Sequence, residues 1–149
     1  MFGALRAKKE PSAPEAGWCV LQTPDNRYII RCNVSAVTIA GSPQYKTRVL
    51  VKAAFHTPTA NGMPEAAESQ ELYDVEDAVC DRFEAAGFAL LVLTMVGNNA
   101  KEMIFYAKDG DRARELLTEL RAQISSHKIQ HNIAEDADWS TYRRFVVAQ

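Results

Sequence analysis

The sequence predicts a single domain of the α+β class. Three observations support this prediction: two segments have apolar residues at helical spacing, the other apolar segments are short enough to be strands, and turn residues separate them. The chain has 149 residues, a length that suits one domain with its own core. Hydrophobic residues make up 47% of the chain and charged residues 24%, as in ordinary globular proteins.

The first seventeen residues are expected to form a flexible N-terminal arm, and residues 18–149 the single domain. The segment from Lys8 to Gly17 contains two prolines and little apolar bulk, so burial cannot offset the entropy lost on ordering it. Its basic residues follow a short apolar stretch, which is the wrong order for a secretory signal. We therefore expect a cytoplasmic protein with reduced cysteines and no membrane span.

A β-hairpin is predicted directly after the arm. Residues 19–23 and 28–34 are rich in strand-forming residues and flank a turn at 25–26. In a hairpin centred on that turn, the numbers of paired residues add up to 51, so Cys19 faces Cys32. We interpret the two cysteines as small core residues, and a disulfide between them is the alternative.

Six further elements are predicted from residue 47 onward. They are, in order, a strand at Thr47–His56, a helix that ends at Gly87, strands at Phe88–Val96 and Glu102–Lys108, a helix that follows the cap Asp109, and a strand at His127–Ile133. This order is that of the split β-α-β sandwich of ferredoxin-like domains, with both helices on one sheet face. The added N-terminal hairpin would extend the sheet or cover its other face.

No pattern typical of a catalytic or cofactor site occurs in the sequence. Nucleophile motifs and glycine-rich phosphate loops are absent, and the net charge of −2 argues against direct binding of nucleic acid. His127 and His131 would lie about 13–14 Å apart along one strand, too far to share a metal ion. His56 ends another strand and could approach either one, but nothing in the sequence requires it. We therefore expect no catalytic residue, no metal and no cofactor.

The first predicted helix carries an acidic stripe. Eight acidic residues and a single arginine lie between Glu65 and Glu84. Five of the acids recur at steps of three or four residues and so share one helix face: Glu71, Asp74, Asp77, Asp81 and Glu84. We interpret the acidic stripe either as a solvated face or as a docking surface for a basic protein partner.

The C-terminal segment is unusually aromatic. Trp139, Tyr142 and Phe145 are spaced so that a helical turn would place all three rings on one side. Because chain ends usually fray, such a cluster implies that the segment docks onto the domain. It is interpreted either as an aromatic clamp on the core or as a ligand or partner site formed by Trp139, Tyr142 and Arg143.

The same segment resembles the ending of an uncharacterised bacterial family, catalogued as domain of unknown function 695. In that family an Asp-Pro-x-Trp-x-x-Tyr element closes the domain. Asp136, Trp139 and Tyr142 match it here, while Ala137 replaces the proline. Three further elements are similar, so that the resemblance covers Trp18 to Phe145: Trp18, Gly62-Met63-Pro64 and Phe105-Tyr106. The resemblance implies no activity, although relatives of the family are connected with acidic regulators that inhibit ribonuclease E.

Three functions remain as expectations. The first is a non-catalytic protein-binding or regulatory module that uses the acidic stripe. The second is a small-molecule binding domain, or an enzyme with an unrecognised site, on an open sheet face lined by Tyr45, His56, Tyr106 or Trp139. The third is a protein that self-associates as a dimer through a sheet face or edge.

Overall fold

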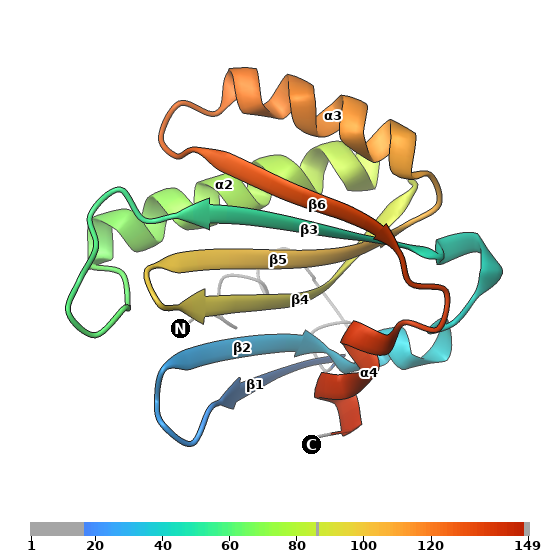
Figure 1. Ribbon diagram of the computed structural model, residues 1–149, viewed down its shortest axis with the longest axis horizontal. Helices are drawn as coiled ribbons and strands as arrows, with labels where there is room; N and C mark the ends of the chain where they lie inside the picture. The colour runs from blue at the N-terminus through green and yellow to red at the C-terminus, as the bar shows by residue number, and fades with distance from the viewer. Residues whose placement is uncertain (1–16, 86, 148–149) are drawn as a thin grey trace.

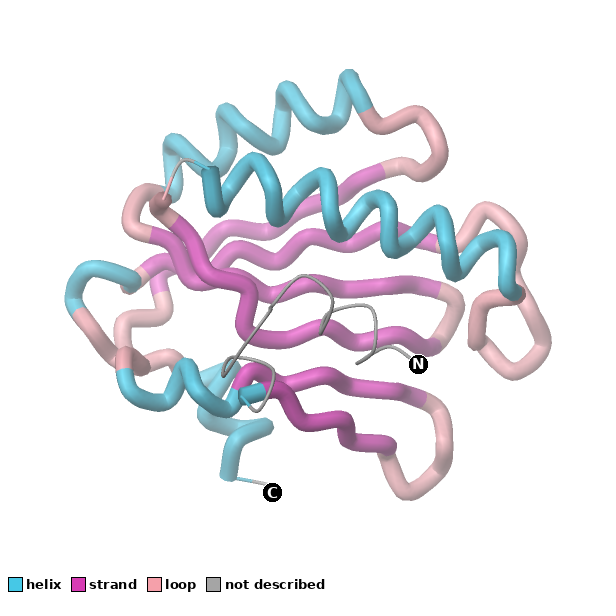
Figure 2. Tube along the Cα trace, turned by 180° about the vertical axis from the view of Figure 1, so that it is seen from behind, coloured by secondary structure: helices cyan, strands magenta, loops and turns pink. Residues whose placement is uncertain are grey.

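The computed structural model describes residues 17–85 and 87–147. These residues form a six-stranded antiparallel sheet with helices on both faces (Figures 1 and 2). The elements in chain order are β1 (Trp18–Gln22), β2 (Tyr28–Asn33), the 3-10 helices η2 (Val34–Thr38) and η3 (Pro43–Tyr45), β3 (Thr47–Ala54), α2 (Ala66–Ala85), β4 (Ala89–Gly97), β5 (Ala100–Ala107), α3 (Gly110–Gln123), β6 (Ile129–Glu135) and α4 (Ser140–Val147). The predicted α+β class is therefore confirmed. No helix in the described ranges is long and apolar enough to cross a membrane.

The arm predicted over residues 1–17 lies outside the described residues, except for Gly17. This glycine is buried beside Ser35, whose hydroxyl oxygen would lie 2.6 Å from a Cβ atom added at position 17. The described chain therefore starts with a closely packed residue just before β1.

The sheet has the strand order β1-β2-β4-β5-β3-β6. β5 lies between β4 and β3, so the connection through α2 passes over one intervening strand, and the connection through α3 likewise passes over β3. The N-terminal hairpin extends the sheet, because β2 pairs with β4 from Tyr28↔Gly97 to Cys32↔Leu93. β1 and β6 are the two edge strands.

The hairpin has the predicted register but a wider turn. Cys19 pairs with Cys32, and both carry thiols. The backbone N–H of Thr23, the residue after β1, donates to the carbonyl of Tyr28 at 3.1 Å, so this bond encloses a turn of four residues, 24–27. A four-residue turn at 24–27 and a two-residue turn at 25–26 have the same centre, and the centre determines which residues of the two strands pair. The register was therefore predictable from the sequence, although the length of the turn was not.

α2 and α3 cover one face of the sheet and enclose the main core with it (Figure 2). The apolar residues of β3 that face the helices are Val49, Val51 and Ala53. They belong to the same core as the buried residues of α2, which are Leu72, Val75, Val79 and Phe83, and those of α3, which are Leu116, Leu117 and Leu120. Gly87 follows α2 with a φ of 68°, as expected for a glycine that ends a helix. Asp109 caps α3 by accepting hydrogen bonds from the N–H groups of Asp111 and Arg112. Both boundaries match the prediction.

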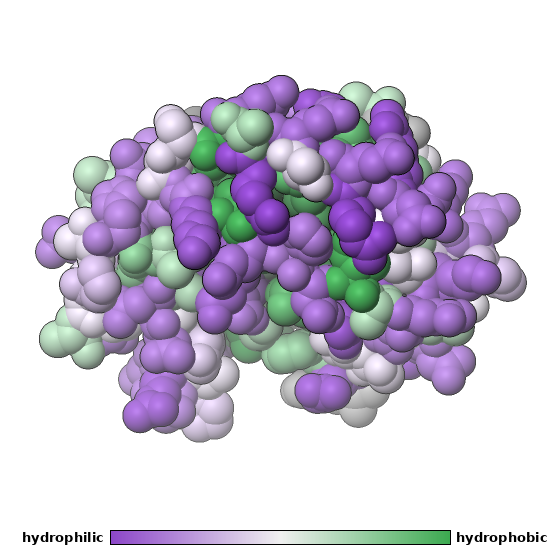
Figure 3. All heavy atoms as spheres, turned by 45° about the horizontal axis from the view of Figure 1, so that its top comes forward, coloured by the Kyte–Doolittle hydropathy of each residue, from purple (hydrophilic) through white to green (hydrophobic). Residues whose placement is uncertain are grey.

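α4 and the two 3-10 helices lie against the other face of the sheet, near β2 and β5 (Figure 1). They bury a second apolar cluster, which includes Ile30, Val92, Ile104, Tyr106, Trp139 and Tyr142. Hydrophilic side chains predominate on the molecular face that carries α3 and β6, and apolar side chains show there in separate patches (Figure 3). The exposed surface of α3 is thus mainly polar.

Candidate functional site

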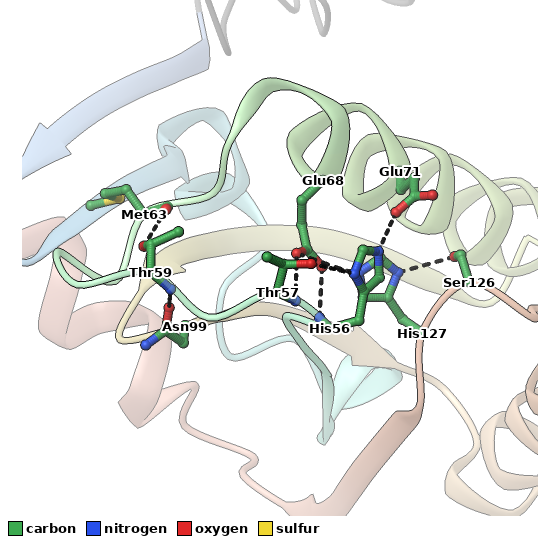
Figure 4. Close-up of polar contacts among 9 residues, drawn as sticks. All are labelled: His56, Thr57, Thr59, Met63, Glu68, Glu71, Asn99, Ser126 and His127. Carbon is green, nitrogen blue, oxygen red and sulfur yellow. Dashed lines mark hydrogen bonds and ion pairs between the residues drawn. The ribbon is translucent and has the colours of Figure 1, made fainter.

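Four side chains of metal-ligating types meet where β3 ends, α2 begins and the chain enters β6 (Figure 4). His56 follows β3, Glu68 and Glu71 lie on the first turns of α2, and His127 lies in the loop between α3 and β6. One ligand atom from each of these residues lies within 4.8 Å of the other three. We call these four residues the His–Glu cluster.

Glu68 forms the buried centre of the His–Glu cluster. Its side chain is 3% exposed, and its carboxylate accepts hydrogen bonds from the backbone N–H of His56 at 2.8 Å and of Thr57 at 3.0 Å. Burial by itself raises the pKa of Glu68. The hydrogen bond from His127 and the bonds from the two amides outweigh burial, however, so the pKa lies below its ordinary value. Glu68 is therefore an ionised carboxylate that holds the loop after β3 against α2.

His127 is the second buried member. Its side chain is fully buried, and its Nε2 atom lies 2.5 Å from Oε2 of Glu68. Its Nδ1 atom lies 3.0 Å from the hydroxyl oxygen of Ser126, and its ring centre is 4.8 Å from that of His56. Both ring nitrogens thus have a polar neighbour, and the ring orientation is fixed.

His56 and Glu71 form the exposed half of the cluster. Nε2 of His56 lies 2.5 Å from Oε1 of Glu71, and the two side chains are 47% and 44% exposed. The hydrogen bond with Glu71 raises the pKa of His56, against a smaller opposite effect of burial. The cluster therefore has a buried half that is fixed by the fold and an exposed half that solvent can reach.

The pairing of β3 with β6 explains why two distant histidines meet. Ala53 pairs with Ile129, so the residues just after β3 and just before β6 lie at the same end of the sheet. The predicted last strand began at His127, but β6 begins at Ile129, and His127 lies in the preceding loop. His131 lies on β6 itself, where its Nδ1 atom is 2.8 Å from a guanidinium nitrogen of Arg121.

No metal ligand is expected from the sequence, which places Glu71 in the acidic stripe and His56 in a possible pocket and gives Glu68 and His127 no site role. The meeting of the four side chains in the His–Glu cluster is what sequence reasoning misses. Glu68 and Glu71, three residues apart at the start of a helix, were one available signal. The other was His56 at the end of a predicted strand. Neither signal is specific until the strand pairing places His127 beside them.

The acidic stripe lies on α2 as predicted. Asp74, Asp81 and Glu84 are exposed, whereas Glu71 and Asp77 are partly buried. Glu71 also belongs to the His–Glu cluster, and Asp74 accepts a hydrogen bond from Gln70 at 3.1 Å. The surface is less acidic than the sequence suggests, because two of the eight acids, Glu68 and Glu76, are buried.

Glu76 takes part in a buried ionic group with two cations. Its Oε1 atom lies 2.7 Å from a guanidinium nitrogen of Arg31 and 2.7 Å from Nζ of Lys101. All three side chains are at most 3% exposed. The Lys101 ammonium also lies 4.2 Å from the centre of the Tyr73 ring. Burial lowers the pKa of Lys101, and the nearby carboxylate of Glu76 opposes that effect.

The aromatic side chains Trp139 and Tyr142, near the end of the described residues, pack against the sheet. Trp139 and Tyr142 are fully buried, and Trp139 stacks on Tyr106 with ring centres 4.1 Å apart. Arg143 is exposed and donates from Nε to the carbonyl of Asp138 and from Nη2 to that of Ala40. The burial and mutual packing of the rings favour the clamp interpretation over a ligand site.

The pocket expected from Tyr45, His56, Tyr106 or Trp139 is not assembled. Tyr106 pairs with Arg48 near the start of β3, whereas His56 follows the opposite end of that strand. Tyr106 is also covered by Trp139, whose indole N–H donates to the carbonyl of Tyr45 at 2.6 Å. These side chains therefore do not converge on one concave surface.

The fold and the site together define a mixed α+β domain with an antiparallel sheet and a cluster of histidine and glutamate side chains at one end of it. The chain belongs to a family of unknown function, DUF695, whose model matches residues 18–147. The resemblance inferred from the sequence is thereby confirmed. Among curated proteins and solved structures, none matches the chain.

Proposed function

We propose that this domain is a non-catalytic protein-binding or regulatory module, and that the acidic stripe of α2 is its docking surface. The observation that supports this proposal is the exposure of Asp74, Asp81 and Glu84 along one helix face. From residue 71 to residue 84 the stripe extends over about 20 Å of the helix, at 1.5 Å per residue. That length suits contact with one element of a partner protein.

The charge of the stripe defines the chemistry of the partner. Like charges three and four residues apart destabilise an isolated helix slightly, and a basic surface placed against them removes this repulsion. Opposite charges also accelerate association and make binding sensitive to salt. The proposed partner is therefore a protein with a basic surface.

Docking on this face would leave the fold unchanged. The opposite side of α2 is buried in the main core through Leu72, Val75, Val79 and Phe83. The exposed acids contribute little to that packing, since surface substitutions usually change stability by no more than about 0.5 kcal/mol. Charge reversals on the stripe can therefore test binding without unfolding the domain.

A pair of matched variants tests the proposal. One carries Asp74→Lys and Asp81→Lys on the stripe, and the other carries Asp111→Lys and Glu115→Lys on the exposed surface of α3, with the same change in charge. Each protein is used as bait in nuclease-treated extract of the source cell, and captured proteins are identified by mass spectrometry. Each captured protein is then purified, and its affinity is measured at low and high salt.

The expected result is a basic protein that binds the wild type and the α3 variant equally. It should bind the stripe variant at least about tenfold more weakly, and high salt should weaken all binding. Equal binding to the two variants, or capture of no basic protein, would contradict the proposal.

A further inference from the structure

We propose that the His–Glu cluster binds one divalent metal ion of the zinc type, with His56, Glu68, Glu71 and His127 as its ligands. This inference does not depend on the proposed docking function. The two share only Glu71, so they can fail separately.

The donor atoms match the chemistry of zinc. Imidazole nitrogens and carboxylate oxygens are common ligands of this ion, and four protein ligands are typical of structural sites. The two glutamates bring two negative charges, which one divalent cation neutralises. Calcium and magnesium are poorer candidates because they prefer sites made entirely of oxygen ligands.

The spacing of the donor atoms is close to that of a tetrahedral site. With metal–ligand bonds of 2.0–2.2 Å, the ligand atoms of such a site lie about 3.3–3.5 Å apart. The four ligand atoms here lie within 4.8 Å of one another, and the two closest nitrogen–oxygen pairs are 2.5 Å apart. Binding thus requires shifts of about 1 Å, which the half-exposed side chains of His56 and Glu71 can make.

The two close pairs mark where the ion would sit. Each pair joins an imidazole nitrogen to a carboxylate oxygen, His127 to Glu68 and His56 to Glu71. Imidazole nitrogens and carboxylate oxygens both ligate metal ions, so the facing atoms of each pair are of ligand type. One divalent ion placed between the two pairs would contact all four residues.

Neighbouring groups hold the buried ligands in position. The backbone amides of His56 and Thr57 fix the carboxylate of Glu68, and the hydroxyl of Ser126 contacts Nδ1 of His127. These contacts leave Nε2 of His127 directed at Glu68 inside the cluster, as Figure 4 shows. Such outer contacts fix ligand orientation in known metal sites. The ion would connect three segments, namely the loop after β3, the start of α2 and the loop before β6, and so stabilise the folded chain.

The test is a zinc titration of the full chain without a histidine tag, since a tag would itself bind zinc. The protein is stripped with a chelator, dialysed and titrated with zinc chloride by calorimetry. Cobalt(II) absorption in the visible range then reports the geometry of the site. His56→Ala and Glu71→Gln remove the two half-exposed ligands, so both variants should fold. His131→Ala and Asp74→Asn are the matched controls.

We expect one zinc ion per chain and a higher melting temperature with zinc. His56→Ala and Glu71→Gln should each weaken binding by about tenfold or more, whereas both controls should bind as the wild type does. Circular dichroism checks the fold of each variant, and Glu71→Gln carries the test if His56→Ala is unfolded.

Three results would overturn the proposal. The first is a wild type that binds no zinc. The second is binding that neither His56→Ala nor Glu71→Gln weakens. The third is binding that His131→Ala abolishes.

Discussion

Nε2 of His127 lies 2.5 Å from Oε2 of Glu68, although 59 residues separate the two in the sequence. The antiparallel pairing of β3 with β6 brings the loop before β6 next to the residues that follow β3. α2 begins at the same end of the sheet and contributes Glu68 (Figure 4). A buried carboxylate thus joins three segments of the chain, so its removal should cost stability.

Glu68→Ala should destabilise the fold by about 2–4 kcal/mol, because the change removes the acceptor of two backbone amides and the carboxylate partner of the buried His127. Urea unfolding in the presence of a chelator measures the loss. Hydrogen exchange at the amides of His56 and Thr57 should also become fast. The exposed neighbour serves as control, since Glu71→Gln should change stability by about 0.5 kcal/mol or less. Equal losses in the two variants would show that Glu68 does not hold the loop.

The buried group of Arg31, Glu76 and Lys101 predicts which of two substitutions destabilises the fold more. Glu76→Gln leaves two buried cations without their shared carboxylate and should destabilise the fold by about 3–5 kcal/mol. Lys101→Met removes one cation and leaves the ion pair of Arg31 with Glu76, so its cost should be smaller, about 1–2 kcal/mol. Denaturant unfolding at neutral pH compares the two variants. The opposite order would mean that the carboxylate is not what keeps the two cations in the interior.

Asp136 should make the fold sensitive to acid. Burial alone would raise the pKa of Asp136, but hydrogen bonds from the hydroxyl of Tyr106 and from Ser140 and Thr141 lower that pKa to about 2. Because the folded pKa is depressed, the stabilisation is fully present above the ordinary pKa of 3.8 and is lost as the pH falls toward 2. Because the carboxylate is partly solvated, solvent screening limits the corresponding free energy to no more than about 2 kcal/mol.

Unfolding of the wild type and of Asp136→Asn at a series of pH values measures this effect. The wild type should be more stable above pH 5, and the gap between the two should close as the pH approaches about 2. Tyr106→Phe removes one of the hydrogen bonds and should give a profile between the two. A gap that stays constant down to low pH would rule out this role of the carboxylate.

The parts of the fold that depend on local chemistry were predictable. The register of the hairpin follows from the position of its turn, and Gly87 and Asp109 mark helix ends through their own backbone and side-chain preferences. The docking of the C-terminal segment followed from three aromatic residues at helical spacing. Each of these features needs only residues that are close together in the sequence.

The parts that depend on distant residues were not predictable. In the sequence, Glu68 and Glu76 are indistinguishable from the six other acids of the same segment. Only the packed structure shows that His127 contacts Glu68, and that Arg31 and Lys101 contact Glu76, in the interior. The His–Glu cluster likewise depends on the pairing of Ala53 with Ile129, which tertiary packing determines. A helix pattern shows which acids share a face, but it does not show which cations lie opposite.

The most direct test of the zinc proposal is a crystal structure of the tag-free chain grown with one equivalent of zinc. Anomalous diffraction is recorded on both sides of the zinc absorption edge. We predict one strong anomalous peak inside the His–Glu cluster, about 2.0–2.2 Å from a nitrogen or oxygen atom of His56, Glu68, Glu71 and His127. A map without a peak in the cluster, or with peaks only at other residues such as His131, would contradict the account.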